Sequence, residues 1–333
     1  MLMRKTFAVL LCAAASLALS DRADAAAKTI KVGLAVPTTD AMYLGWEAFK
    51  QYIEKKGDGS LKVDIYPNSQ LGSGDRELNE AAQFGDVTCA SGSTSPLATL
   101  VPDLLVLDVP FSFMNRDAVF AALDGELGDA LRKSIAAKGL ITPKFWGNGF
   151  RNVTNNRRPI RTPDDLDGLK LRTMENPLQI AAWRAMGANP TPMAFGEVFT
   201  ALQQGTMDGQ ENPYTLIVNM RFYEVQKYLT TTQHVYTAVA PVCNKAFYDG
   251  LTTAQKTLFG EAFDEATRVQ RSMLLKLEQD SVAVIAKAGT QIIDLTDTER
   301  MAFRKGTPAA LALAKQRVSP EVFAAYQKAT GVK

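Results

Sequence analysis

Residues 168–177, with the sequence GLKLRTMENP, contain the pattern that decides the fold class. Gly168 ends a turn, and Leu169 to Thr173 reads as a short strand. Asn176-Pro177 is a typical helix start, because asparagine caps helices and proline is tolerated at the first helical position. A strand that leads directly into a helix is the building unit of an α/β fold. The sequence therefore predicts that this segment is one such unit.

The same succession of strands and helices extends outward from this unit over most of the chain. We expect parallel strand-helix-strand units whose sheets are covered on both faces, with ligands at the carboxyl ends of the strands. The strands are predicted at 30–36, 61–66, 87–90, 141–146 and 169–173, and the helices at 40–56, 75–84 and 197–204. Sharp turns are predicted at 147–149, where the chain would change lobes, and at 208–213, where polar side chains precede a helix.

A long stretch without proline runs from Thr252 to Ala288, just before Gly289. Its apolar residues recur every three or four positions, which is typical of one helical stripe. A helix of about 36 residues would be about 54 Å long at 1.5 Å per residue, which exceeds the width of one lobe. We therefore expect this helix to run across two lobes.

Residues 1–25 have the features of a secretory signal peptide. A positive start, Met1 to Lys5, precedes an apolar run from Phe7 to Leu19 that is too short to span a bilayer. Small residues at Ala23-Asp24-Ala25 suit a signal peptidase. We therefore predict that this peptide is removed and that the mature protein lies free in the periplasm.

Length and composition limit the classes of protein further. The 333 residues suggest about two domains at roughly 150 residues per domain. A count of 37 basic against 35 acidic residues is too balanced for a nucleic-acid-binding surface. The single histidine, His234, has no cysteine or aspartate at metal-ligand spacing, so we expect a hydrogen-bonded structural role. Because no nucleophile elbow, phosphate loop or dinucleotide fingerprint occurs, we predict no catalytic residue, no metal and no cofactor.

Two cysteines, Cys89 and Cys243, follow the predicted signal peptide. Each lies in an apolar segment, where a cysteine behaves as a small hydrophobic residue. This setting favours two buried thiols over a disulfide, although an oxidising compartment would also allow the two to pair.

Polar side chains lie at several strand ends of the second half. Arg172 ends a predicted strand, Arg151 follows the predicted turn at 147–149, and Asn212 precedes Pro213. Two guanidinium groups in one cleft would suit a carboxylate, because each planar fork donates two parallel hydrogen bonds. From spacing alone, a surface ion pair is the commoner role of such an arginine.

Several strings of sequence resemble the substrate-binding proteins of TRAP (tripartite ATP-independent periplasmic) transporters. The strings are GDREL (74–78), LDVPF (107–111), NGFR (148–151), GLKLR (168–172), GANPTPM (187–193), ALQQG (201–205), DGQENP (208–213) and FYEVQKY (222–228). The resemblance runs from about Lys28 to the end of the long predicted helix and is densest between Asn148 and Lys227. It implies the two-lobed periplasmic binding protein fold, with a ligand cleft between the lobes and the long helix spanning both.

The resemblance also implies lobe boundaries and site residues. Lobe I would comprise residues 26–148 and 238–277, and lobe II residues 149–237 and 278–333. Arg172 would hold a ligand carboxylate, with Arg151 as a second arginine contact, Asn212 as a polar contact and Phe195 as an apolar wall. The candidates in the first lobe are Thr38, Tyr43, Arg76 and Ser91, of which Ser91 replaces a carboxylate found in some relatives that bind sialic acid.

Glu175 lies three residues beyond Arg172 and could point into the cleft. An ionised carboxylate accepts hydrogen bonds from hydroxyls and repels a second carboxylate, so Glu175 would favour a hydroxylated monocarboxylate such as a sugar acid. The alternative is that Glu175 complements the N-terminus of the following helix.

Taken with the missing catalytic motifs, the resemblance implies a periplasmic solute-binding protein and not an enzyme. The ligand would be a small organic acid, either a sugar or hydroxy acid or a C4-dicarboxylate, and the partners would be the membrane subunits of the transporter. A ligand-sensing module that docks on a receptor is the alternative, and a periplasmic hydrolase is disfavoured by the motifs.

Overall fold

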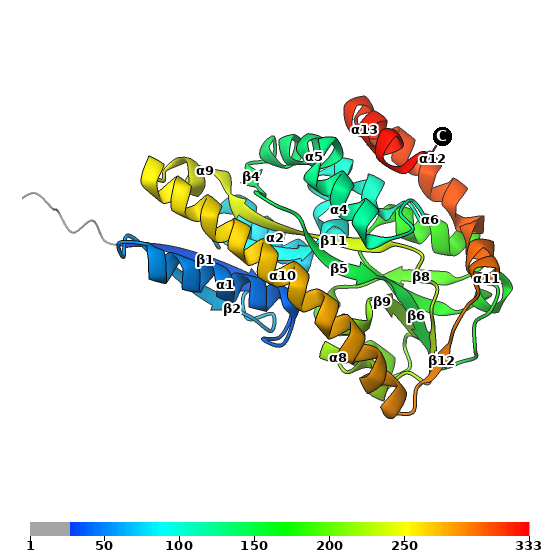
Figure 1. Ribbon diagram of the computed structural model, residues 1–333. Coiled ribbons are helices and arrows are strands. Elements are labelled where there is room, and N and C mark those ends of the chain that lie inside the picture. The colour runs from blue at the N-terminus through cyan, green and yellow to red at the C-terminus, as the bar shows by residue number, and fades with distance from the viewer. Residues whose placement is uncertain (1–26, 333) are drawn as a thin grey trace, which may run out of the picture.

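The computed structural model describes residues 27–332, so the predicted signal peptide lies outside the described residues. Two six-stranded sheets form the centre of the molecule (Figure 1). The first sheet has the order β2-β1-β3-β11-β4 with β5 also paired to β11, and it consists of β1 (Lys28–Leu34), β2 (Leu61–Tyr66), β3 (Cys89–Ser93), β4 (Leu140–Ile141), β5 (Trp146–Phe150) and β11 (Tyr236–Asn244). The second sheet has the order β12-β10-β6-β9-β7-β8, and it consists of β6 (Asn152–Asn155), β7 (Lys170–Thr173), β8 (Asn189–Pro192), β9 (Gly209–Asn212), β10 (Tyr228–Thr230) and β12 (Gln291–Ile293).

Helices surround both sheets. The α-helices are α1 (Ala41–Lys56), α2 (Asp75–Phe84), α3 (Thr94–Leu97), α4 (Arg116–Asp124), α5 (Glu126–Ala136), α6 (Pro177–Ala185), α7 (Val198–Gln203), α8 (Tyr214–Asn219), α9 (Lys245–Asp249), α10 (Thr253–Lys287), α11 (Asp297–Ala302), α12 (Thr307–Arg317) and α13 (Pro320–Thr330). The short 3-10 helices are η1 (Pro102–Asp108), η2 (Pro163–Leu166), η3 (Phe195–Glu197), η4 (Phe222–Glu224) and η5 (Phe303–Gly306). Between residues 27 and 332, no helix is both long enough and apolar enough to cross a bilayer.

The α/β fold class is confirmed, but the sheets are mixed in strand direction. Strands β2 and β3 are parallel to β1, as predicted, whereas β11 is antiparallel to β3. In the second sheet, β6 is likewise antiparallel to β9. The prediction of parallel units is therefore wrong for the strands at which the chain passes from one sheet to the other, because such a strand does not follow a crossover helix within its own sheet.

The predicted turn at 147–149 is also wrong, because these residues lie inside β5. The chain instead changes sheets at Arg151, between β5 and β6. Gly147 is needed for close packing: a Cβ atom there would lie 2.4 Å from the hydroxyl of Tyr236. Tight packing against a neighbouring strand and a sharp turn both select glycine, so the sequence alone did not separate the two.

The polar stretch 208–213 contains a strand where we expect a turn. Strand β9 lies between β6 and β7 in the second sheet, and all four of its residues are buried. Buried polar side chains are stable when they are hydrogen-bonded, and Gln210, Glu211 and Asn212 all are. The polarity of this strand therefore reflects an internal network and not exposure to solvent.

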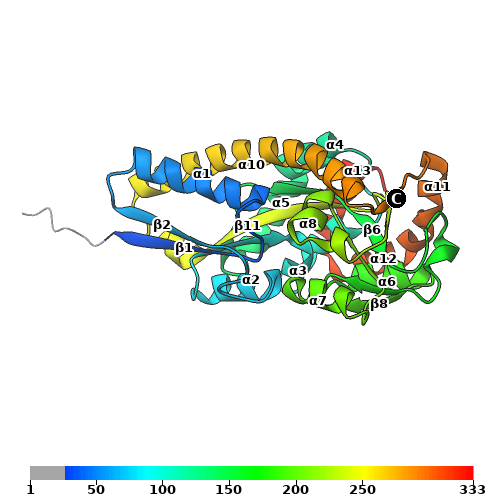
Figure 2. The ribbon, with the colours of Figure 1, turned by 90° about the horizontal axis from the view of Figure 1, so that it is seen from below.

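The long helix is confirmed as α10, within one residue of the predicted ends. Its start has the capping box that the sequence suggests, since the Gln255 side chain accepts the N–H of Thr252 at 3.0 Å and the Thr252 hydroxyl accepts the N–H of Gln255 at 3.2 Å. The helix runs beside α1 and then beside α8 (Figure 2). Phe259 and Phe263 of α10 contact Phe49 of α1 edge-on.

Cys89 and Cys243 form a disulfide between β3 and β11, so the expectation of two separate thiols is wrong. The two residues are direct partners in the antiparallel register, and their Cα atoms are 4.0 Å apart. Both side chains are buried in apolar surroundings, as the sequence indicates. The pairing depends on the strand register, which the sequence did not reveal.

The C-terminal helices contact elements on both sides of the molecule. Helix α12 packs on α6 and on η1, and α13 packs on α5 (Figure 1). One apolar cluster accordingly includes Leu178 of α6, Leu105 of η1 and Tyr326 of α13. This cluster holds the beginning of α6, and with it the end of β7, against the first sheet's helices.

Candidate functional site

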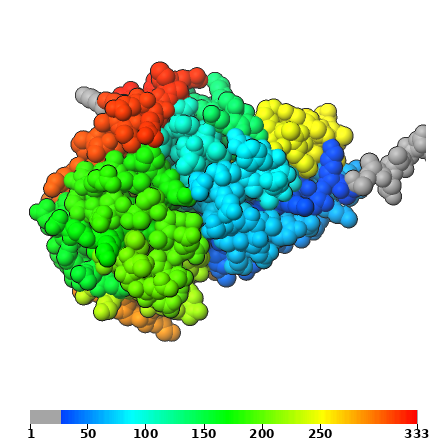
Figure 3. Space-filling view, turned by 180° about the vertical axis from the view of Figure 1, so that it is seen from behind, coloured from blue at the N-terminus to red at the C-terminus, as the bar shows by residue number. Residues whose placement is uncertain are grey.

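A pocket lies between the two sheets. From the first sheet and its helices it is lined by Val36, Met42, Asp75, Ser93, Pro96 and Asn148. From the second sheet and its helices it is lined by Arg172, Met174, Glu175, Phe195, Asn212 and Leu216. Several of these residues lie at or just beyond the carboxyl ends of β1, β3 and β7, the edge at which α/β proteins bind ligands. The space-filling view shows the blue to cyan N-terminal part meeting the green middle part along one boundary (Figure 3).

Arg172 has a donor atom that nothing in the described part of the chain uses. Its Nε and Nη2 donate to the carbonyl oxygen of Met193 at 3.0 and 2.6 Å, but its Nη1 is buried without a partner. Burial lowers the pKa of Arg172 to about 10, so the side chain remains a cation at neutral pH. A buried cationic donor without a partner is unfavourable, so the Nη1 of Arg172 is available to an acceptor such as an anion.

Asn148 provides a second unused donor in the same pocket. Its side chain is buried, and its Nδ2 has no partner among residues 27–332. Asn148 lies on β5 of the first sheet, whereas Arg172 ends β7 of the second. The pocket therefore presents hydrogen-bond donors from both sheets.

Asp75 places a carboxyl group in the pocket, which the sequence reasoning did not foresee. Its Oδ2 accepts the backbone N–H of Ser93 at 2.8 Å. Burial raises the pKa of Asp75 to about 6, partly offset by the Ser93 bond and the charge of Arg172. The candidate from the sequence is its neighbour Arg76. Asp75 directly follows Gly74 at the start of a helix, and this position is a signal for a polar side chain at a helix N-terminus.

Glu175 lines the pocket but is already paired. Its Oε1 accepts the Nε of Arg76 at 2.8 Å, and Arg76 also contacts Glu80 at 3.1 Å. The ion pair joins α2 to the segment that follows β7. The helix start after Glu175 is capped by Asn176, whose Oδ1 accepts the N–H of Leu178 at 2.9 Å. Glu175 is therefore not the cap of α6, and Arg76 balances its charge.

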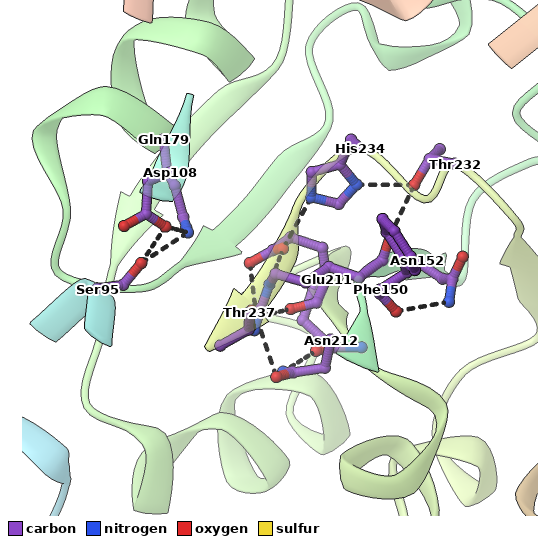
Figure 4. A network of polar contacts seen from close by, with 12 residues as sticks. Ser95, Asp108, Phe150, Asn152, Gln179, Glu211, Asn212, Thr232, His234 and Thr237 are labelled. Atoms are coloured by element: carbon purple, nitrogen blue, oxygen red, sulfur yellow. Dashed lines mark hydrogen bonds and ion pairs between the residues drawn. The ribbon is translucent and has the colours of Figure 1, made fainter. Parts of the chain in front are cut away.

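Arg151 is fully buried but lies outside the pocket lining. Its Nε and Nη2 bind the carboxylate of Glu211, its Nη2 also binds Asn212 Oδ1 at 2.9 Å, and its Nη1 donates to Thr237 Oγ1 at 3.0 Å. Figure 4 shows Glu211, Asn212 and Thr237 close together. The structure thus surrounds Arg151 with acceptors from its own chain. Asn212, in contrast, both contacts Arg151 and lines the pocket.

Glu211 is the centre of this internal network and was not anticipated. Although burial opposes its ionisation, Arg151 and His234 lower the pKa of Glu211 to about 2. His234 lies 3.0 Å from the Glu211 carboxylate through Nε2 and 2.8 Å from Thr232 Oγ1 through Nδ1. The structural role predicted for His234 is therefore confirmed. The sequence offers no local signal for Glu211, because its partners lie far away along the chain.

The remaining candidates from the first lobe also lie outside the lining. Ser91 is buried and accepts the Nε1 of Trp46 at 2.8 Å. Tyr43 is half-buried against an apolar cluster, and Thr38 is exposed. Of the nine residues predicted from the sequence, the lining brings together Arg172, Glu175, Phe195 and Asn212.

A second polar network joins η1 to the start of α6 (Figure 4). Asp108 accepts a short hydrogen bond from Ser95, one from Gln179 at 2.9 Å and one from Asn176 at 2.9 Å. Burial raises the pKa of Asp108 to about 6, against the effect of these hydrogen bonds. The network fixes the helix start next to Glu175.

Comparison with known proteins gives consistent matches over almost the whole chain. The model of a family described as bacterial extracellular solute-binding protein, family 7 (DctP) matches residues 32–316. The chain is 36% identical over 289 residues to the 2,3-diketo-L-gulonate-binding periplasmic protein YiaO of Escherichia coli, covering 87% of each chain. It is 36% identical over 334 residues to the C4-dicarboxylate-binding periplasmic protein DctP of Rhodobacter capsulatus, covering 99% of each. The crystal structure of the sugar acid binding protein DctPAm from Advenella mimigardefordensis in complex with galactonate superposes with a TM-score of 0.86 at 33% identity, covering 91% of this chain and 99% of that one.

Proposed function

The chain belongs to family 7 of the bacterial extracellular solute-binding proteins, the solute-binding components of TRAP transporters, and we propose that it captures an organic acid in the pocket between its two sheets. The relatives are named for binding a diketo sugar acid and C4-dicarboxylates, and one solved structure contains galactonate. We place the protein in the periplasm, after removal of residues 1–25, and its membrane partners are the TRAP transporter subunits that receive the ligand.

The observation that carries this proposal is the Nη1 of Arg172 in the pocket, which has no partner from residues 27–332. A carboxylate there would complete the guanidinium group, and Asn148 Nδ2 would donate a further hydrogen bond to the ligand. Micromolar affinity corresponds to about −8 kcal/mol. Hydrogen bonds to charged groups contribute about 1.5 to 3 kcal/mol each, so a few of them together with burial of the ligand would suffice after ordering costs.

We propose that the ligand is enclosed by movement of the two lobes, with residues 26–148 and 238–277 in the first and 149–237 and 278–333 in the second. The connections at Arg151 and at 231–235 would form the hinge, and α10 would brace both lobes. The pocket is lined from both sheets, so a ligand would hold the two lobes together.

Calorimetry on the mature protein tests the proposal, with uronates, aldonates and C4-dicarboxylates as ligands. Arg172→Ala is expected to lower the affinity about 30-fold or more, because a charged hydrogen-bonding group is lost. Arg157→Ala is the matched control, since Arg157 is an exposed arginine outside the pocket lining. Retained affinity in Arg172→Ala, with the control unchanged, would refute the carboxylate contact. Recovery of a chemically altered ligand would point to an enzyme instead.

A further inference from the structure

The carboxyl group of Asp75 is held in the pocket by the local backbone. Asp75 is the first residue of α2, and its Oδ2 accepts the N–H of Ser93 on β3. The carboxyl group lies directly over Gly92, where a Cβ atom would come within 2.2 Å of its Cγ. The glycine on β3 therefore leaves the space that Asp75 occupies.

Asp75 also lacks the compensation that Glu175 has. No lysine or arginine among residues 27–332 forms an ion pair with Asp75, and its Oδ1 accepts no hydrogen bond from those residues. Glu175, in contrast, is paired with Arg76 at 2.8 Å. Of the two pocket carboxyl groups, Asp75 is thus the one whose charge is not balanced by an ion pair within residues 27–332.

The pocket therefore has two kinds of unused group. Arg172 Nη1 and Asn148 Nδ2 require acceptors, which a carboxylate supplies. Asp75 Oδ1 requires a donor, which a hydroxyl supplies and an ionised carboxylate does not. A second carboxylate on the ligand would instead face the Asp75 carboxyl group, and two such groups in one site cannot both ionise without cost.

From this arrangement we propose that Asp75 determines ligand specificity by accepting a hydroxyl of the acid bound at Arg172, so that the protein selects hydroxylated monocarboxylates over dicarboxylates of equal length. The proposal rests on the proposed function, since it concerns the same pocket. It assigns to Asp75 the discrimination that the sequence suggests for Glu175.

Two pairs of acids of equal length test this proposal by calorimetry. D-Erythronate and succinate both have four carbons, and D-galactonate and adipate both have six. In each pair one acid has hydroxyls and the other has a second carboxylate. Butyrate, which has neither, separates a lost hydroxyl contact from charge repulsion. The wild-type protein is expected to bind at least one hydroxy acid about 10-fold or more tightly than the dicarboxylate of its pair.

Asp75→Asn is the informative variant, because asparagine retains the shape and an oxygen for the Ser93 N–H while removing the charge. We expect its affinity for the hydroxy acid to fall about 10-fold or more, its affinity for the dicarboxylate to rise, and its affinity for butyrate to stay nearly unchanged. Glu77→Gln is the matched control, as the same change in the first turn of α2 but outside the pocket lining.

The outcomes separate the two proposals. An unchanged ratio of hydroxy acid to dicarboxylate affinity in Asp75→Asn would overturn the role of Asp75 and leave the proposed function standing. If Asp75→Asn does not fold, measurements on the wild-type protein still test the inference. Equal or tighter binding of the dicarboxylate in both pairs would overturn it. A wild-type protein that binds no organic acid at all would overturn the proposed function itself.

Discussion

Arg151 and Arg172 are both buried at the junction of the two sheets, but their surroundings differ. The donors of Arg151 are used by Glu211, Asn212 and Thr237. Arg172 contacts one carbonyl oxygen, and its Nη1 has no partner in the described part of the chain. The difference teaches that burial of an arginine does not indicate its role, because the role depends on which acceptors the fold supplies. The fold itself satisfies the donors of Arg151, whereas it leaves one donor of Arg172 unused within residues 27–332.

The largest effect is expected for Arg151→Met. This change would leave the Glu211 carboxylate buried without its cation, and breaking a buried ion pair costs about 3 to 5 kcal/mol. Urea unfolding should therefore show a free energy of unfolding lower by about that amount. Arg157→Met, at an exposed arginine, serves as the control. Unchanged stability of Arg151→Met would end the distinction between the two arginines.

Arg172→Met should show the opposite pattern. Removing a desolvated cation with an unused donor is expected to change the free energy of unfolding less than Arg151→Met does. Binding of carboxylates should nevertheless weaken by about 2 to 3 kcal/mol, which is 30- to 150-fold, because a charge-assisted contact is lost. Paired measurements by urea unfolding and calorimetry check this. If Arg172→Met unfolded as readily as Arg151→Met, Arg172 would be a structural residue.

The pH dependence of stability should also differ between the buried aspartates and Glu211, the partner of Arg151. Burial raises the pKa of Asp40, Asp75 and Asp108 to about 6. Their contribution to the free energy of unfolding is therefore full below their unfolded pKa of 3.8 and is lost as pH rises through 6. The pKa of Glu211 is lowered to about 2, so its contribution is present above 4.5 and is lost as pH falls towards 2.

Urea unfolding without ligand should therefore give the highest stability near pH 3.5, as judged from these four groups, because three raised carboxyl groups outweigh the single lowered one above that pH. Asp108→Asn should flatten the decline in the free energy of unfolding between pH 4 and 6, because one of the raised carboxyl groups is removed. A free energy of unfolding that increases steadily from pH 4 to 6 would contradict this assignment.

The smallest effect is expected for Glu175→Gln. The Arg76–Glu175 pair is partly exposed to solvent, and such pairs contribute about 0 to 1 kcal/mol. The free energy of unfolding should fall by no more than that, and the preference between erythronate and succinate should change less than in Asp75→Asn. A larger change in ligand preference than in Asp75→Asn would return the discriminating role to Glu175.

Local signals in the sequence predicted the elements well, because their causes lie within a few residues. Helix α2 begins at Asp75 and stops at Gly85, and α10 begins at the Thr252 cap, as expected from capping residues and glycines. The same reasoning failed for β9, where polarity suggested a turn. Its polar side chains are satisfied by residues that are distant in sequence, which no local pattern reveals.

The candidate site was predictable only in part, for the same reason. The family resemblance predicted Arg172 and Asn212 as site residues, and both line the pocket. It also predicted Arg151, whose partner Glu211 lies 60 positions away along the chain. Whether a donor atom is free depends on all of its neighbours in space. Asp75 and Asn148 both lie in strings that resemble the family, GDREL and NGFR. Whether their side-chain atoms are free for a ligand depends on the pocket lining and on the unpaired atoms within it.

The packing of α10 has a mechanical consequence. Its first half is fastened to α1 by buried side chains such as Phe259 and Phe263, whereas beyond residue 277 only Ser281 and Ile285 are buried. A helix without an internal proline resists bending, since each residue is tied to the next turn. Helix α10 therefore acts as a stiff brace that links the part of the molecule around α1 to the part around α8.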